Sequence, residues 1–251
     1  MPHLARRPAF LGALSRLLGL GGPVRGQCPP SLLDNNALCR DIDQGKPLEA
    51  YDYVVFDAEM TGLSPRRDEI VSLGAVRVKN LQILPYERFE ALVKPSIPLP
   101  RLSTIIHRIT PQAIREAPPL AEVLPDFFAF CRGSLLVGHH VGLDMAFLTR
   151  ACRALYGETP VNPCLDTMRL AMLWRERLFE SHYDRYNLSV SYNLADLARE
   201  HGLPVFPSHN AMADAMQTAY LFLFLVKKLR KSGIGALKEL YLSGRSWRWY
   251  G

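Results

Sequence analysis

Three runs of strand type near the start of the chain limit its fold more than any other feature. Residues 53–56 are apolar with β-branched and aromatic side chains, residues 70–78 have the same character, and a third run covers about 88–93. The segment Lys79-Asn80-Leu81-Gln82, between the second and third runs, has the composition of a turn. The sequence therefore predicts an antiparallel meander of three strands.

Helical periodicity dominates the rest of the chain. Apolar residues recur at helical spacing from Leu120 to Cys131 and from Met145 to Leu155, with a short strand expected between them at 135–138. Further helices are expected at about 166–179, 194–201 and 210–230. Strands that come first as a meander and then alternate with helices predict an α/β domain with a mixed sheet.

The length of 251 residues suits one domain with short appendages. Residues 1–48 are rich in Pro, Gly and Arg and are interpreted as an N-terminal leader or extension, and residues 49–232 as the domain. Residues 233–251 form a tail in which basic and aromatic side chains alternate. Such a tail can bind single-stranded nucleic acid by charge and base stacking, or it can dock on the domain or on a partner protein.

The charge balance is moderately basic, with 30 Lys and Arg against 24 Asp and Glu, which would attract a polyanion without requiring one. The five cysteines are widely spread and never form a C-x-x-C pair, so a reducing cytoplasm is expected. The apolar patch at 10–20 contains Arg16 and precedes no small-residue cleavage site, which favours an amphipathic helix or arm over a secretory signal. The apolar run at 219–226 is too short to span a membrane.

The first strand runs into two carboxylates, Asp57 and Glu59. Side chains on a strand alternate between faces, so the two carboxylates are expected on the same face. They repel each other unless cations lie between them, which makes the pair a candidate site for a hard metal ion. An acidic pair at a strand end can also simply be solvated.

Two later segments hold further candidates. Asp144 follows the strand at 135–138 and starts a helix, where an aspartate can also be a simple N-cap. His209 and Asp214 lie five positions apart at the start of the long helix, so both can reach one site from its N-terminal end. Taken alone, they could equally be a surface histidine and an aspartate stabilised by the helix dipole.

Together, D-x-E on the first strand, a later isolated Asp and a final H-x4-D resemble the pattern of the DnaQ-like DEDDh exonucleases. That family includes the proofreading subunit of bacterial DNA polymerase III. The segment 57–62 is similar to the family's D-x-E-T-T-G, and 70–76 is similar to the strand that follows it. The segment 106–110 stands in the place of the family's substrate-side histidine loop, and the similarity spans about 51–228.

The resemblance implies a ribonuclease H-like fold, with a mixed five-stranded sheet flanked by helices. It implies that two Mg²⁺ or Mn²⁺ ions are bound by four carboxylates, those of Asp57, Glu59, Asp144 and Asp214. It makes His209 the general base. It also implies a set of substrate-binding residues near the metals, namely Met60, Thr61, Gly62, Leu63 and His107.

Some positions depart from the family's pattern. Met60 replaces a common Thr, and His140 and Leu143 replace Asn and Phe, so these residues bear on substrate preference. His139 and His140 are interpreted as structural, because adjacent residues at a strand end cannot both face the metals. Asp166 is interpreted as a supporting residue at a helix start.

The resemblance implies a 3′→5′ exonuclease that releases nucleoside 5′-monophosphates from DNA with a free 3′ end, in proofreading or repair. An exoribonuclease that trims RNA is an alternative with the same chemistry. A second alternative is a non-catalytic module that binds nucleic acid or a polymerase, which would predict damage to the acidic set. A DNA polymerase subunit is a candidate partner, no membrane is expected, and the oligomeric state stays open.

Overall fold

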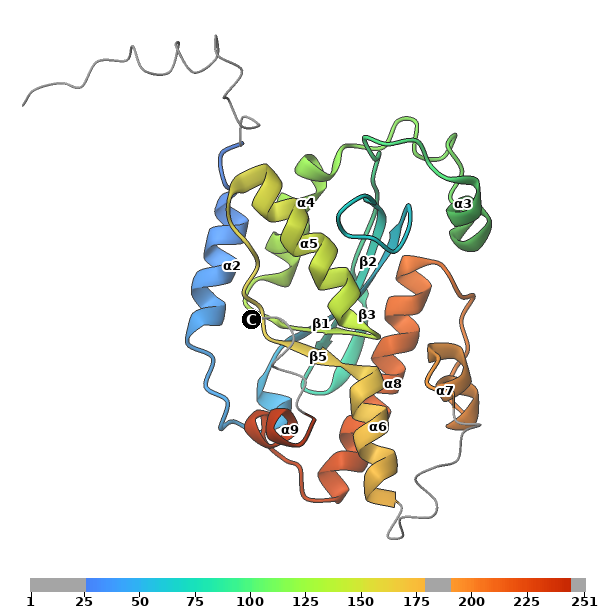
Figure 1. Ribbon diagram of the computed structural model, residues 1–251. Coiled ribbons are helices and arrows are strands. Elements are labelled where there is room, and N and C mark those ends of the chain that lie inside the picture. Colours follow the sequence, from blue (N-terminus) through green and yellow to red (C-terminus); the bar gives the residue numbers. More distant parts are fainter. Residues whose placement is uncertain (1–25, 179–190, 245–251) are drawn as a thin grey trace, which may run out of the picture.

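The computed structural model describes residues 26–178 and 191–244 and contains a five-stranded sheet in the order β3-β2-β1-β4-β5 (Figure 1). β1 pairs antiparallel with β2, and β2 with β3, whereas β4 is parallel to β1 and β5 is parallel to β4. The strands are β1 (Tyr53–Met60), β2 (Ile70–Lys79), β3 (Gln82–Leu92), β4 (Leu135–Gly138) and β5 (Cys164–Asp166). The predicted mixed sheet with a three-strand meander is confirmed.

Helices pack on both faces of this sheet. One core joins the sheet to α4 (Leu120–Cys131) and α5 (Val141–Tyr156). The other core joins it to α6 (Thr167–Leu178), α8 (Ala211–Lys231) and α9 (Leu237–Gly244). The remaining helices are α2 (Pro30–Arg40), the 3₁₀ turn Leu48–Ala50, α3 (Arg101–His107) and α7 (Leu194–Glu200). No helix of the described residues is long and apolar enough to cross a membrane.

The alternation of side chains along β1 places its carboxylates. Val54 and Phe56 are buried in the core beneath α4 and α5, whereas Tyr53 and Val55 are buried in the core beneath α8. Asp57 and Glu59 follow the period of Tyr53 and Val55, so they point to the face that α8 covers. The strand therefore presents its acidic pair to the helix that carries Asp214.

The N-terminal extension contributes one docked helix among its described residues. α2 packs against α4, as Figure 1 shows, and buries Leu32 completely. The side chain of Asn35 donates to Asn162 Oδ1 at 2.7 Å, which ties α2 to the segment before β5. The leader residues 1–25, the end of the helix expected at 166–179 and the tail residues 245–251 lie outside the described residues.

Gly74 of β2 brings the start of α8 against the sheet. A Cβ added there would lie 2.3 Å from Ala211 C and from Met212 N, both backbone atoms. Gly74→Ala is therefore expected to destabilise the protein by about 1–3 kcal/mol, because the first turn of α8 has to move away from the strand. Urea unfolding measures this free energy.

Gly235→Ala is the matched control for this prediction. A Cβ at Gly235 would have its nearest neighbour, Glu239 Oε2, at 3.9 Å. An alanine at 235 is expected to change the free energy of unfolding by less than about 0.5 kcal/mol. Equal losses in the two variants would contradict the argument from close packing at Gly74.

Candidate active site

Three carboxylates meet where β1 approaches the start of α8. Asp57, Glu59 and Asp214 each offer one oxygen, and these oxygens all lie within 4.8 Å of one another. We call this group the acidic cluster. All three side chains are partly buried, so the charges are close together and shielded from bulk water. Asp57 and Glu59 share one face of the strand, as the alternation predicts.

Asp144 lies beside the acidic cluster but outside the group of three oxygens. Its side chain is buried, and Oδ1 accepts a hydrogen bond from the Ala58 N–H at 3.2 Å. β4 pairs with β1 only over Tyr53–Val55, so the backbone of Ala58 lies beyond the end of that pairing. The first turn of α5 therefore places the carboxylate of Asp144 against the backbone of Ala58, the residue between Asp57 and Glu59.

Burial and mutual repulsion raise the pKa values of these carboxyl groups. Burial raises the pKa of Asp57 well above its usual range, and the charges of Asp144, Asp214 and Glu59 raise it further. Burial and Asp214 raise the pKa of Glu59 to about 7, and burial raises the pKa of Asp144 to about 8 against the effect of its N–H partners. The raised pKa values show that the deprotonated carboxylates are destabilised by burial and by one another. A bound cation would offset this repulsion, so the group is suited to a metal ion.

His209 stands directly before α8 in a left-handed backbone conformation, with φ of 64°. Its backbone N–H donates to Asp214 Oδ2 at 2.7 Å, which links the two ends of the H-x4-D pattern. The cap of α8 is Asn210, whose side chain accepts from the Ala213 N–H. His209 is thus not the N-cap of α8, and its exposed imidazole forms no part of the helix cap.

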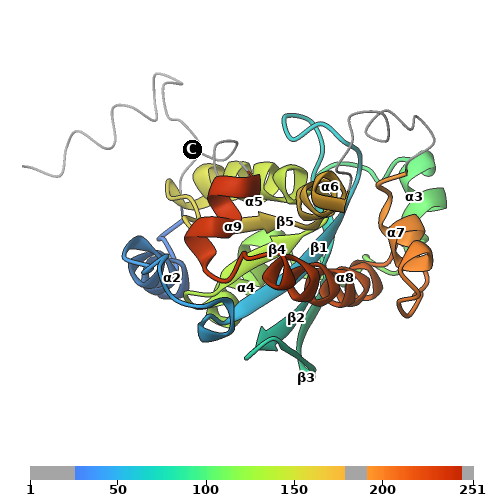
Figure 2. The same cartoon turned by 90° about the horizontal axis from the view of Figure 1, so that it is seen from below.

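His107, at the end of α3, is buried beside this region. Its Nδ1 accepts from the Ile109 N–H at 3.0 Å, so the neutral ring carries its proton on Nε2. Nε2 is buried and has no hydrogen-bond partner among the described residues. Burial lowers the pKa of His107, and the nearby His209 lowers it further. Figures 1 and 2 both show α3 beyond the N-terminal end of α8.

The loop 61–69, between β1 and β2, holds the other predicted substrate contacts. Leu63 is 79% exposed in this loop. Met60 is half-buried at the end of β1. Thr61 is buried instead, and its hydroxyl donates to Asp68 Oδ1 at 3.0 Å. The hydroxyl of Thr61 is therefore engaged within the protein.

The two adjacent histidines have structural contacts. The ring of His139 forms hydrogen bonds with Thr167 Oγ1 and Tyr192 O, and burial lowers its pKa to about 4. The backbone N–H of His140 donates to Asp166 Oδ1 at 3.1 Å. Asp166 also accepts from the Met168 N–H, which supports its interpretation as a residue that secures a helix start.

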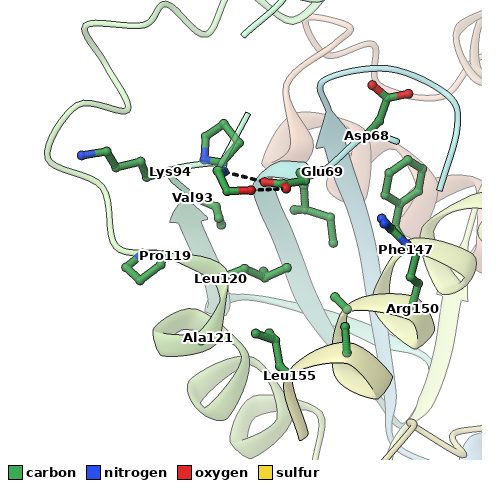
Figure 3. A pocket seen from close by; sticks show the side chains of 15 residues that line it. Asp68, Glu69, Val93, Lys94, Pro119, Leu120, Ala121, Phe147, Arg150 and Leu155 are labelled. Atoms are coloured by element: carbon green, nitrogen blue, oxygen red, sulfur yellow. Dashed lines mark hydrogen bonds between the residues drawn. The ribbon is translucent and has the colours of Figure 1, made fainter. Parts of the chain in front are cut away.

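A pocket of about 290 Å³ lies apart from the acidic cluster (Figure 3). Its walls come from the end of the loop 61–69, the segment after β3 and one side of α5, including Glu69, Leu120 and Phe147. None of the four carboxylates of the predicted metal site lines it. This pocket is therefore not the site of the expected chemistry.

The chain is similar to a known protein family and to several named relatives. Residues 54–222 match the model of the exonuclease family of the RNase T type. A DNA polymerase III PolC-type protein of Caldanaerobacter subterraneus subsp. tengcongensis is 34% identical over 75% of this chain and 12% of its own length. A DNA polymerase III subunit epsilon-like protein of Rhodobacter capsulatus is 35% identical over 80% of this chain and 28% of its own length. The chain thus spans less than a third of either relative.

Solved structures share the fold. Exonuclease X in complex with 5′ overhanging duplex DNA has a TM-score of 0.55 and 24% identity, covering 76% of this chain and 99% of that one. E. coli exonuclease I in complex with a dT13 oligonucleotide has a TM-score of 0.62 and 18% identity, covering 72% of this chain and 42% of that one. With the family match over more than half of its length, this chain belongs to the DnaQ-like exonucleases of the RNase T family.

Proposed function

We propose that this chain is a 3′→5′ exonuclease that releases nucleoside 5′-monophosphates from the 3′ end of DNA, with residues 49–232 as its catalytic domain. The observation that carries the proposal is the acidic cluster, in which β1 and α8 bring three carboxylate oxygens within 4.8 Å of one another. The relatives named for DNA polymerase III favour DNA as the substrate and a DNA polymerase subunit as a partner.

The residues present fit divalent metal ions. Asp57, Glu59 and Asp214 offer only oxygen ligands, which Mg²⁺ and Mn²⁺ prefer, and their partly buried charges require compensation. We propose that two ions are held by these residues together with Asp144. When bound, such ions supply positive charge to the scissile phosphate and make a water molecule more acidic.

His209 is proposed as the general base. The backbone N–H of His209 donates to Asp214, so the residue borders the acidic cluster. The helix cap is formed by Asn210, so the exposed imidazole of His209 takes no part in it. It would accept a proton as the oxygen of water forms a bond to phosphorus. The bond from phosphorus to the 3′ oxygen of the preceding nucleotide then breaks, and this oxygen takes up a proton from solvent water to become the new 3′ hydroxyl.

Binding of the 3′ end is assigned to residues around the acidic cluster. The exposed Leu63 and the half-buried Met60 would contact the terminal base, and the backbone at Gly62 would approach it closely. The Nε2–H of His107 would donate to a substrate oxygen, because a buried donor that has no partner among the described residues is costly unless a ligand satisfies it.

A labelled-oligonucleotide assay tests the proposed function. With Mg²⁺ or Mn²⁺, DNA labelled at its 5′ end should shorten from the 3′ end one nucleotide at a time, and DNA should be degraded faster than RNA of the same sequence. Faster degradation of RNA at every length would favour the exoribonuclease. Wild-type protein that is as inactive as Asp57→Ala on all substrates would leave only the non-catalytic module.

His209→Asn is expected to lower kcat by about 10²–10⁴-fold, because the protein loses its general base. Asparagine is chosen since it tolerates the left-handed backbone of this position and keeps the N–H that binds Asp214. The melting temperature should therefore stay unchanged. Initial rates at saturating substrate measure the effect, and a kcat within a few-fold of wild type would exclude His209 as the base.

A further inference from the structure

The loop 61–69 is closed on itself by the carboxylate of Asp68. Oδ1 accepts from the hydroxyl of Thr61 at 3.0 Å, and Oδ2 accepts from the backbone N–H of Ser64 at 2.9 Å. Thr61 Oγ1 in turn accepts from the Glu69 N–H at 3.0 Å. Asp68 therefore connects the beginning, the middle and the end of the loop. We call these bonds the Asp68 clasp.

Gly62 lies directly against the clasp. A Cβ at Gly62 would lie 2.6 Å from Asp68 Oδ2 and 2.7 Å from its carboxyl carbon. A glycine at this position thus lets the carboxylate close over the backbone of the loop. The residues on either side of Leu63, which are Gly62 and Ser64, are held by contact or by hydrogen bond to the same carboxylate.

Both side-chain oxygens of Asp68 face donors, so the position requires a group that only accepts. Asparagine would present an amide N–H to one of these two donors. The backbone N–H of Ser64 cannot accept, so the hydrogen bond to Thr61 could survive only if the Thr61 hydroxyl accepted instead of donating. Thr61 Oγ1 already accepts from Glu69, although a hydroxyl has a second lone pair. Asparagine should therefore preserve the clasp in part, and alanine should abolish it.

A separate contact fixes the end of the loop to the rest of the fold. The carboxylate of Glu69 accepts from the backbone N–H and the hydroxyl of Ser96, as the dashed lines in Figure 3 show. This contact lies on the wall of the pocket of about 290 Å³, away from the loop tip. The loop thus has two sets of bonds, one that anchors its end and one that shapes its tip.

We propose that Asp68 is a positioning residue for the 3′ end of the substrate, an inference that rests on the proposed function. The clasp fixes the backbone on both sides of the exposed Leu63, in the loop that leaves β1 just after Glu59, before substrate arrives. A loop that is already ordered loses less conformational entropy when the terminal nucleotide binds. Asp68 contributes nothing to the reacting atoms, so its effect falls on substrate binding.

The test measures KM and kcat for a DNA oligonucleotide with Asp68→Ala, Asp68→Asn and Thr61→Val. KM should rise about ten-fold in Asp68→Ala and less in Asp68→Asn, while kcat changes less than about two-fold, as expected for the loss of uniform binding. Thr61→Val keeps the side-chain shape but removes the hydroxyl, and it should reproduce most of the rise. Ser96→Ala, which loosens only the Glu69 anchor, should leave KM unchanged.

Proteolysis provides a readout that does not depend on activity. Arg66 and Arg67 are exposed within the loop, and loops that lose their internal bonds are cut faster. Thr61→Val leaves both trypsin sites intact, so trypsin should cleave after them faster than in the wild type. A purely structural role would instead lower the melting temperature and the active fraction, and would leave KM unchanged.

The outcomes separate the two proposals. An active wild type whose KM is unchanged in Asp68→Ala and Thr61→Val would overturn the role of Asp68 and leave the proposed function standing. A wild type without nuclease activity would overturn the proposed function, and the role of Asp68 in binding a 3′ end would fall with it. A kcat reduced as much as kcat/KM would likewise exclude positioning.

Discussion

Asp57→Asn is expected to lower kcat/KM at least about 10³-fold, because a metal ligand at the centre of the site loses its charge and several kcal/mol of transition-state stabilisation are lost with it. Asp57 is the natural target since its carboxyl group interacts with all three of the other carboxylates, Asp144, Asp214 and Glu59. Initial rates on a single-stranded oligonucleotide at several Mn²⁺ concentrations measure the loss.

The same substitution should stabilise the metal-free protein. A buried carboxylate surrounded by like charges destabilises the fold, and asparagine has nearly the same shape without the charge. We therefore expect a higher melting temperature in chelator together with the loss of activity. Asp126→Asn, an exposed carboxylate on α4, is the matched control and should change neither property. Parallel losses of activity and stability would indicate a folding defect rather than a lost ligand.

The part of the site that sequence could predict follows from strand geometry. Alternation along β1 is sufficient to put Asp57 and Glu59 on one face, and the burial of Tyr53 and Val55 shows which face that is. The approach of Asp214 could be expected only from the family pattern, since no local rule says which helix covers that face. Local sequence fixes neighbours within an element, whereas contacts between elements depend on the whole fold.

Other features depend on where elements end. Asp144 accepts from the Ala58 N–H because β4 pairs with β1 only as far as Val55, a limit that strand propensity does not reveal. The Asp68 clasp was not predicted either, because Asp68 stands in a polar loop where an aspartate usually faces solvent. The signal that could have suggested it is Thr61 seven positions before Asp68 across a loop that contains Gly62.

The missed elements are short or begin with proline. α2 and α3 follow Pro29 and Pro100, in segments for which the sequence predicts no regular element, although proline is favourable at a helix start. β5 has three residues and gains its partner only from β4, so its sequence carries little strand signal. β3 is longer than expected. Its register with β2 shifts at Pro85 to Glu87, which have no partner in the register, and these residues interrupt the apolar pattern of the strand.

Removal of divalent metal is expected to abolish activity and to make stability fall as the pH rises from about 7 to about 8. The folded pKa values of Glu59 and Asp144, about 7 and about 8, lie above their values in the unfolded chain. In this window the folded protein still binds protons that the unfolded chain has released, so a further rise in pH favours unfolding.

Buried histidines act in the opposite direction, but at lower pH. Burial lowers the pKa of His139 to about 4, so its neutral form adds stability as the pH rises. That gain is complete once the unfolded histidine has lost its proton, near its usual pKa of about 6.5. The lowered pKa values of His107 and His201 follow the same rule. Above about pH 7 the raised carboxyl pKa values therefore determine the slope.

Bound metal should reverse this trend, because the ions bind the deprotonated carboxylates. At a free Mg²⁺ or Mn²⁺ concentration of about 100 times Kd, one site adds about 2.7 kcal/mol, or about 5–10 °C in melting temperature. The shift should be larger at pH 8 than at pH 7 and should disappear in Asp57→Asn. Thermal melts in chelator and in metal at both pH values test this. A metal-free protein whose stability rises with pH in this window would show that the acidic cluster carries no excess of buried charge, and the case for a metal site would lose its electrostatic basis.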